Sequence, residues 1–283
     1  MDRLQLEILE ERACPSAPTY HGGPIIQDPA VATLFVGAYN PIFDQAVSVA
    51  VANYTQILGV FGVHNDASRN GTVTIGPTGP LTNQQVGSLL GQEIAANVLP
   101  QPLSPNQMYM VFLDQGSVSD IPNAGAYHTW TTYNGTPIAY TVCFLTGPNA
   151  GPYGIFHEYA EATTDPFPGW AGHEGWYTGN YQEIADLANG ASFSLDGFPA
   201  ATVVGPNGQL ITGPTSVVTT NPPPQPPTQP PVSVIDTTTF GVNLFNFFEQ
   251  EITALESLWQ SWLTEVVSLE TQLWNQLGFH LWL

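Results

Sequence analysis

The chain has 283 residues, with 23 acidic side chains against three basic ones and no lysine, so its formal net charge at pH 7 is −20. This charge repels phosphate backbones and anionic lipids, which excludes nucleic-acid binding and favours an extracellular or acid-tolerant surface. Hydrophobic residues make up 43% of the chain, which suits a globular core. The sequence contains no run of 18 apolar residues, so no membrane span is predicted. Residues 1–15 lack the apolar stretch of an ordinary signal peptide.

Strand-like and helix-like segments alternate in the first half of the chain, after an N-terminal arm over residues 1–19. Short apolar runs predict buried strands, and apolar residues recurring every three to four positions predict the helices between them. Thr82 is the expected N-cap of the second helix. In chain order we expect a strand at 31–38, a helix at 42–58, a strand at 72–75, a helix at 82–98 and a strand at 108–114.

A predicted hairpin follows, with strands at residues 127–133 and 136–145 and its turn at Asn134-Gly135. Asn-Gly favours the turn types that match the twist of paired strands. A helix at 153–163 comes next and ends at Thr164-Asp165-Pro166, because proline disfavours helical geometry in the residue before it. With a last hairpin within 201–213, the pattern predicts an α/β (α+β) fold with a mixed sheet over residues 20–220.

Seven prolines within residues 221–231 mark a domain boundary and predict an extended linker over residues 221–234. Apolar residues from Phe245 to Leu273 then recur at steps of three and four, which predicts a long hydrophobic helix within residues 235–283. Such a helix needs a partner. Three alternatives stay open: packing on its own domain, self-association into a homo-oligomer, and membrane-surface binding, which the lack of basic residues disfavours.

The stretch "GIFHEYAEATTDP" carries the strongest chemical signal. Residues four apart share one face of a helix, so His157 and Glu161 can reach the same ion, while Glu158 can contact a water bound to it. This is the spacing of H-E-x-x-H metallopeptidases with the second histidine replaced by a carboxylate, and Glu158 is the expected general base. The alternative is a partly exposed helix whose histidine and acids are merely solvated.

A third metal ligand is required, and we expect it to be Glu183 in "YQEIADLA". Asp186 would lie on the same face and orient His157, and Asp165 is a rival ligand, although it also serves as a helix stop. The expected ion is Zn2+, but two carboxylates and one histidine also suit Ca2+ or Mn2+.

Other polar residues are weaker candidates. His21 and His128 are expected either to line the cleft or bind metal, or to be hydrogen-bonded structural histidines. His173 and Tyr177 are candidate donors to a developing oxyanion, and we assign Tyr177 to the catalytic set. Cys14 and Cys143 allow one disulfide, whose formation the sequence leaves open.

The chain as far as about Asn189 resembles the Exordium-like (phosphate-induced protein) family of secreted proteins. The matching pieces occur in the family's order: "YHGGPII", "LSPNQMYMVFLD", "AYHTW", "HEYAEATTDP", "GWY" and "EIADL". The resemblance implies a zincin-like metallopeptidase domain in a secreted or cell-surface protein. It also implies that His157, Glu158, Glu161 and Glu183 are the functional positions. The proline-rich linker and the C-terminal helix are not part of the resemblance.

The expected function is therefore metal-dependent hydrolysis of a peptide or cell-surface polymer. The competing expectation is an extracellular structural or adhesive protein that self-assembles through the C-terminal helix and whose metal site is vestigial or only braces the fold.

Overall fold

The computed structural model describes residues 17–114, 121, 124–147 and 149–214. Contacts divide the chain between Pro226 and Pro227, inside the proline-rich stretch, and all described residues belong to the first unit. The predicted linker and C-terminal helix therefore lie outside the described residues, as do most of the N-terminal arm and Cys14. Cys143 is described and is a buried free thiol.

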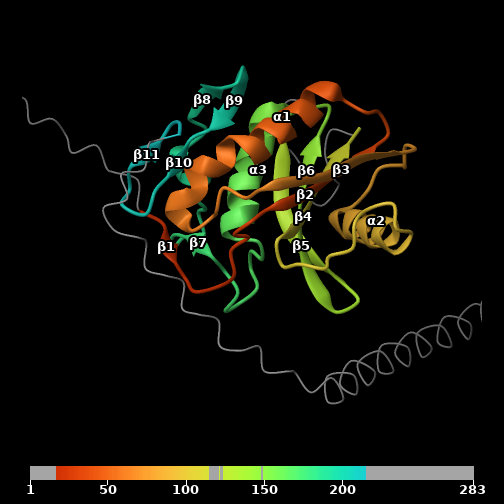
Figure 1. Cartoon of the computed structure of the whole chain (residues 1–283), viewed down its shortest axis with the longest axis horizontal. Coiled ribbons are helices and arrows are strands. Elements are labelled where there is room, and N and C mark those ends of the chain that lie inside the picture. The colour runs from red at the N-terminus through yellow and green to blue at the C-terminus, as the bar shows by residue number, and fades with distance from the viewer. Residues whose placement is uncertain (1–16, 115–120, 122–123, 148, 215–283) are drawn as a thin grey trace, which may run out of the picture. The chain divides into compact units, whose positions relative to one another are not determined.

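A five-stranded mixed sheet forms the centre of the described unit, in the order β3-β2-β4-β6-β5 (Figure 1). Four strands run parallel, and β5 pairs antiparallel with β6 at one edge. The coarse prediction of an α/β (α+β) fold with a mixed sheet is confirmed. The strands are β2 (Ala30–Val36), β3 (Ser68–Ile75), β4 (Gln107–Leu113), β5 (Ala126–Tyr133) and β6 (Thr136–Phe144).

Helices cover both faces of this sheet, with α1 and α3 on one face and α2 on the other (Figure 1). Along β4, Met108, Met110 and Phe112 enter the core under α1 and α3, while the alternate residues enter the core under α2. Strands buried on both faces explain why the sequence shows continuous apolar runs there. The helical segments are α1 (Pro41–Ala52), η1 (Tyr54–Phe61), α2 (Asn83–Ala95), α3 (Pro152–Thr164) and η2 (Asp186–Ala188).

Three short antiparallel pairs complete the unit. β1 (Thr19–Tyr20) pairs with β7 (Trp176–Tyr177), and β8 (Ser192–Leu195) pairs with β9 (Phe198–Ala201). β10 (Val203–Val204) pairs with β11 (Leu210–Ile211), which confirms the last predicted hairpin. None of the described helices combines the length and apolarity needed to cross a bilayer.

Local signals account for most element boundaries. Thr82 caps α2 as predicted, in a reciprocal capping box with Gln85. The predicted helix over residues 42–58 is wrong as one continuous helix, since α1 ends at Ala52 and a 3-10 segment follows. The Thr55 hydroxyl donates to the carbonyls of Ala50 and Val51, a local bond that competes with continuation of the α-helix.

Candidate metal centre

Helix α3 carries the H-E-x-x-E residues and is fixed at both ends. Pro152 stands at its first turn, where the missing N–H costs no hydrogen bond. At the other end Asp165 is the C-cap, and its carboxylate accepts the amide of Gly175 at 2.8 Å. This bond ties the end of α3 to the loop that leads to β7, so both are held in one place.

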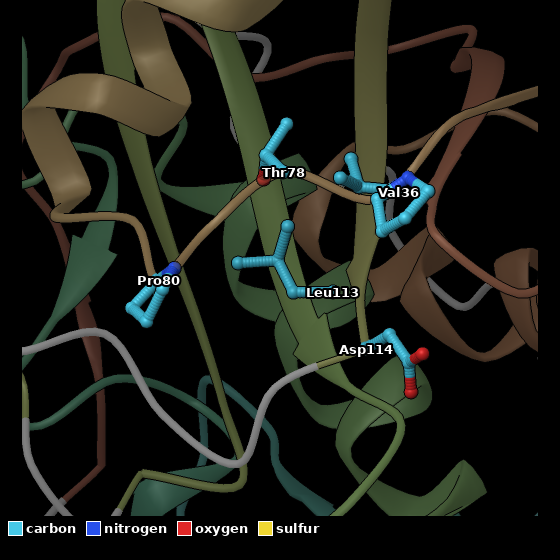
Figure 2. Close-up of a pocket in the computed structure, with 6 residues that line it drawn as sticks. Val36, Thr78, Pro80, Leu113 and Asp114 are labelled. Carbon is cyan, nitrogen blue, oxygen red and sulfur yellow. The ribbon is translucent and has the colours of Figure 1, made fainter.

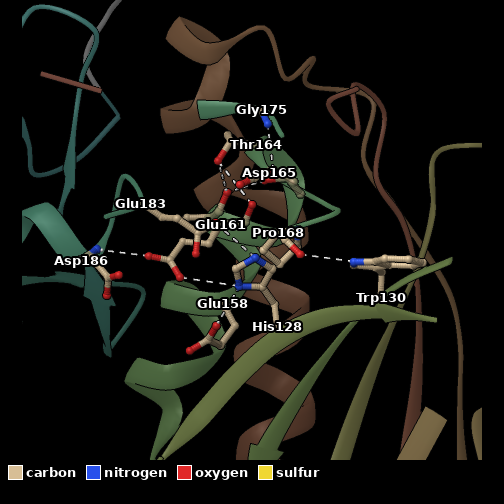
Figure 3. A network of polar contacts seen from close by, with 12 residues as sticks. His128, Trp130, Glu158, Glu161, Thr164, Asp165, Pro168, Gly175, Glu183 and Asp186 are labelled. Atoms are coloured by element: carbon tan, nitrogen blue, oxygen red, sulfur yellow. Dashed lines mark hydrogen bonds and ion pairs between the residues drawn. The ribbon is translucent and has the colours of Figure 1, made fainter. Parts of the chain in front are cut away.

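Six side chains from three segments converge beside α3, and we call them the carboxylate–histidine cluster. Strand β5 supplies one histidine, α3 supplies one histidine and two acids, and the segment at η2 supplies two further acids. Figure 3 shows His128 facing the acids of α3 and Glu183. The members are His128, His157, Glu158, Glu161, Glu183 and Asp186.

One half of the cluster surrounds His157. Its Nε2 lies 3.2 Å from Glu161 Oε1 and 3.3 Å from Asp186 Oδ1. The Asp186 amide also donates to Glu161 Oε1 at 3.1 Å, which holds η2 against α3. The Asp186 side chain is 48% exposed, against 4% for Glu161, so this half of the cluster faces solvent.

The other half surrounds His128, whose side chain is only 4% exposed. Its Nδ1 lies 3.3 Å from Glu158 Oε2 and 3.7 Å from Glu161 Oε2. On the opposite edge of the ring, Nε2 lies 3.2 Å from Glu183 Oε1. Neither of these two buried atoms has a hydrogen-bond partner in the described part of the chain.

The donor set fits a divalent cation. Two atoms bound to one tetrahedral zinc at the usual bond length are separated by roughly 3.3 Å, because that is the edge of the tetrahedron. The separations of His157 Nε2 from Glu161 and from Asp186 match this edge. Two groups of three residues could each hold an ion, because the candidate ligand atoms within each group lie within 4.8 Å of one another. The groups are His157-Glu161-Asp186 and His128-Glu158-Glu161.

Electrostatics also favour a bound cation. The four carboxylates of the cluster outnumber its two imidazoles, and among the described residues Arg69 is the only lysine or arginine. Arg69 pairs with Asp44 instead, at 2.6 Å. Burying uncompensated negative charge is costly, and neutralisation by protons or by a metal ion relieves it.

Burial and charged neighbours shift the pKa values of the residues in the cluster. Burial raises the pKa of Glu158, Glu161 and Glu183. Burial lowers the pKa of His157, but hydrogen bonds to Asp186 and Glu161 outweigh this effect and raise it to about 12. Burial likewise lowers the pKa of His128, and the charge of Glu183 and the contact with Glu158 raise it well above its usual value. Perturbed groups gathered in one place are typical of a functional site.

The expected ligand set is brought together only in part. His157 and Glu161 meet as predicted by their spacing, whereas Glu183 is paired with His128 and Asp186 takes the position beside His157. Asp165, the rival ligand, is engaged with the Gly175 amide. His128 is only a weak candidate in the sequence, where the "AYHTW" motif is its single signal.

Tyr177, His21 and His173 lie in aromatic contacts. The Tyr177 ring stacks on His21 with centroids 3.8 Å apart, and on its other neighbour, Tyr181, at 5.4 Å. His173 stacks on Trp170 at 4.0 Å. Tyr177 is coupled to the cluster through the backbone, since it forms an isolated antiparallel bridge with Glu183.

A separate cavity of about 260 Å³ lies at the carboxyl ends of β2 and β4 (Figure 2). The described residues that line it include one carboxylate and no histidine, so they do not assemble a metal or hydrolytic set. The lining residues are Val36, Pro77, Thr78, Pro80, Leu113 and Asp114.

Comparison with protein families, curated proteins and solved structures gives no match for this chain.

Proposed function

We propose that the protein is a metal-dependent peptide hydrolase whose cation is held by His157, Glu161 and Asp186. The observation that carries this proposal is the pair of 3.2 and 3.3 Å separations around His157 Nε2, on the side of the cluster that faces solvent. Catalytic zinc sites combine three protein ligands with one position open to water or substrate. The neighbouring half of the cluster, around His128, is more deeply buried.

A divalent cation at this place would polarise the scissile carbonyl and lower the pKa of water. Glu158 is the residue that accepts a proton from the attacking water and returns it to the leaving amine. Burial raises its pKa, which brings it closer to the value that suits a base working near neutral pH. His128 Nδ1, 3.3 Å from Glu158 Oε2, fixes the orientation of the carboxylate.

The position of β5 supports a peptide as substrate. β5 is an edge strand that pairs with β6 along one side, and it carries His128 of the cluster. An edge strand presents N–H and C=O groups to which an extended peptide can add as a further strand. A peptide bound in this way would run past the cluster.

Zn2+ is the proposed ion, with Mn2+ or Ca2+ as alternatives because oxygen donors outnumber nitrogen donors. The Exordium-like, zincin-like affiliation and the secreted or cell-surface location remain proposals that rest on the motifs. The same applies to a homo-oligomer or partner contact through residues 235–283.

Peptide cleavage tests the proposal directly. The full chain, loaded with Zn2+, should cleave members of a quenched fluorescent peptide library, and a chelator should abolish the cleavage. Glu158→Gln should retain the metal but lose turnover, because only the proton acceptor is removed. Turnover by the Glu158→Gln protein at the wild-type rate would show that Glu158 is not the base.

A second candidate function, a structural role for the site, is favoured by one observation. The cluster joins β5, α3 and η2, so a bound cation would brace three segments without any chemistry. In that case metal removal should lower thermal stability, no peptide should be cleaved, and truncation before residue 221 should abolish concentration-dependent assembly.

A further inference from the structure

Three rings form two successive stacked pairs, His21 with Tyr177 and Tyr177 with Tyr181, and we call them the aromatic stack. The Tyr177 and Tyr181 rings are nearly parallel, with an interplanar angle of 7°. Tyr181 stands at one end of the stack, and 74% of the residue is exposed. A large exposed ring gains little from burial, so packing alone does not explain its position.

The backbone at Tyr181 is also unusual. Its φ of 58° lies in the left-handed region, which bulky residues rarely adopt. The Tyr181 amide donates to the Thr178 carbonyl, and the Thr178 amide donates to Gln182, so a tight turn holds this conformation. Residues held in such sparsely populated backbone conformations cluster at active sites and ligand clamps. The strain and the exposure are independent observations on the same residue.

The turn leads directly into the proposed site. Tyr177 bridges to Glu183, and Glu183 is paired with His128. Tyr181 stands two residues before Glu183 in the chain, so an extended peptide that spans from its ring to Glu183 would contact both. The stack is placed to contact a part of the substrate away from the scissile bond.

Charge indicates what that part of the substrate is. The chain carries a net charge of −20, and Asp186, with a half-exposed side chain, stands at the margin of the cluster. Such a field concentrates cationic molecules and repels acidic ones. The face of a tyrosine ring attracts ammonium and guanidinium groups, and guanidinium also stacks on it through its flat surface. A neutral glycan would stack on the rings, but the negative charge of the protein would not attract it.

We propose that the aromatic stack is a subsite for a lysine or arginine side chain of the peptide substrate. This inference rests on the proposed hydrolytic function and names its substrate class. It also gives a reason for the absence of lysine from the whole chain, since the protein then offers few cleavage sites to other copies of itself. Arg69, the arginine in the described residues, is bound by Asp44.

Binding measured without turnover tests the subsite. The full-length Glu158→Gln protein, loaded with Zn2+, is titrated into a fluorescently labelled lysine-rich peptide, and anisotropy gives the Kd. Tyr181→Ala should weaken binding about 2- to 5-fold, the contribution of a partly exposed cation–π contact. Tyr181→Phe should bind as the parent does, because the ring is kept. Tyr39→Ala is the matched control, since it removes another exposed tyrosine, 49% exposed, from a different part of the surface.

Several results would contradict the assignment of the aromatic stack as a subsite for a basic side chain. These are an equal loss of binding in Tyr39→Ala, unchanged binding in Tyr181→Ala, and equal affinity for a glutamate-rich peptide of the same length. Displacement of the basic peptide by a neutral oligosaccharide would assign the stack to glycans instead. The two proposals fail separately. Binding through Tyr181 without cleavage by the wild-type protein would refute hydrolysis alone, and cleavage of peptides regardless of charge would refute the subsite alone.

Discussion

His157 Nε2 lies 3.3 Å from Asp186 Oδ1, so the histidine of α3 pairs with the first residue of η2. Glu183 stands three residues earlier and faces His128. The two acids of "EIADL" are therefore divided between the two histidines of the cluster. We infer that Asp186 belongs to the proposed metal set and that Glu183 supports His128.

This division predicts unequal effects of two substitutions on zinc affinity. Asp186→Ala removes a ligand atom and should weaken Zn2+ binding by more than the roughly 10- to 100-fold typical of an outer-shell partner. Glu183→Gln should stay within that range, because it alters the surroundings of His128. Competition with a chromophoric chelator measures both Kd values. A larger loss in Glu183→Gln would restore Glu183 as the ligand.

Metal binding should release protons. Hydrogen bonds to Asp186 and Glu161 raise the pKa of His157 to about 12 despite its burial, so the metal-free ring is protonated at pH 7. A cation must displace the proton from Nε2, and its affinity should therefore fall as the pH is lowered. Calorimetric titration with Zn2+ in two buffers of different ionisation enthalpy checks this. Identical heats in both buffers would mean that no proton is released.

Gly175 tests how closely the loop after α3 is packed. A Cβ at this position would lie 1.9 Å from the Thr164 carbonyl oxygen, so Gly175→Ala must displace the chain between Asp165 and β7. We expect a loss of about 1–3 kcal/mol in the free energy of unfolding, with weaker metal binding. Gly179→Ala is the control, since a Cβ there meets nothing within 4 Å. Urea denaturation of both variants gives the comparison, and equal stability would contradict the packing argument.

The Asp44–Arg69 pair predicts a pH dependence of stability away from the site. Partial burial raises the pKa of Asp44, but hydrogen bonds from Arg69 and Thr72 outweigh this effect and hold the pKa below its usual 3.8. The contribution of a carboxylate with a lowered pKa is fully present above the unfolded value and is lost as the pH falls through the folded value. The stability gap between wild type and Asp44→Asn should therefore shrink below about pH 4. A gap that widens on acidification would refute this assignment.

Much of the fold follows from local signals in the sequence. The continuous apolar runs of β2 and β4 indicate strands buried on both faces, and the structure places them in the middle of the sheet. Asn134 and Gly135 adopt positive φ values of 49° and 77°, which confirms the predicted hairpin turn. These features depend on residues close in sequence, and this is why they could be predicted.

The site could be predicted only where its geometry is local. His157 and Glu161 meet because they are four residues apart on one helix. The approach of His128 depends on β5 pairing at the edge of the sheet, a tertiary arrangement that no spacing encodes. The choice between Glu183 and Asp186 depends on the path of the chain from the Tyr177–Glu183 bridge into η2, which begins at Asp186.

The metal content of the purified protein tests the central claim most directly. Elemental analysis should find bound divalent metal in the wild type and in His64→Ala, which removes an exposed histidine paired with Asp28. His157→Ala should lose the metal, because the only imidazole of the proposed ligand set is gone. Equal metal content in His157→Ala and in the wild type would contradict the assignment of the metal centre.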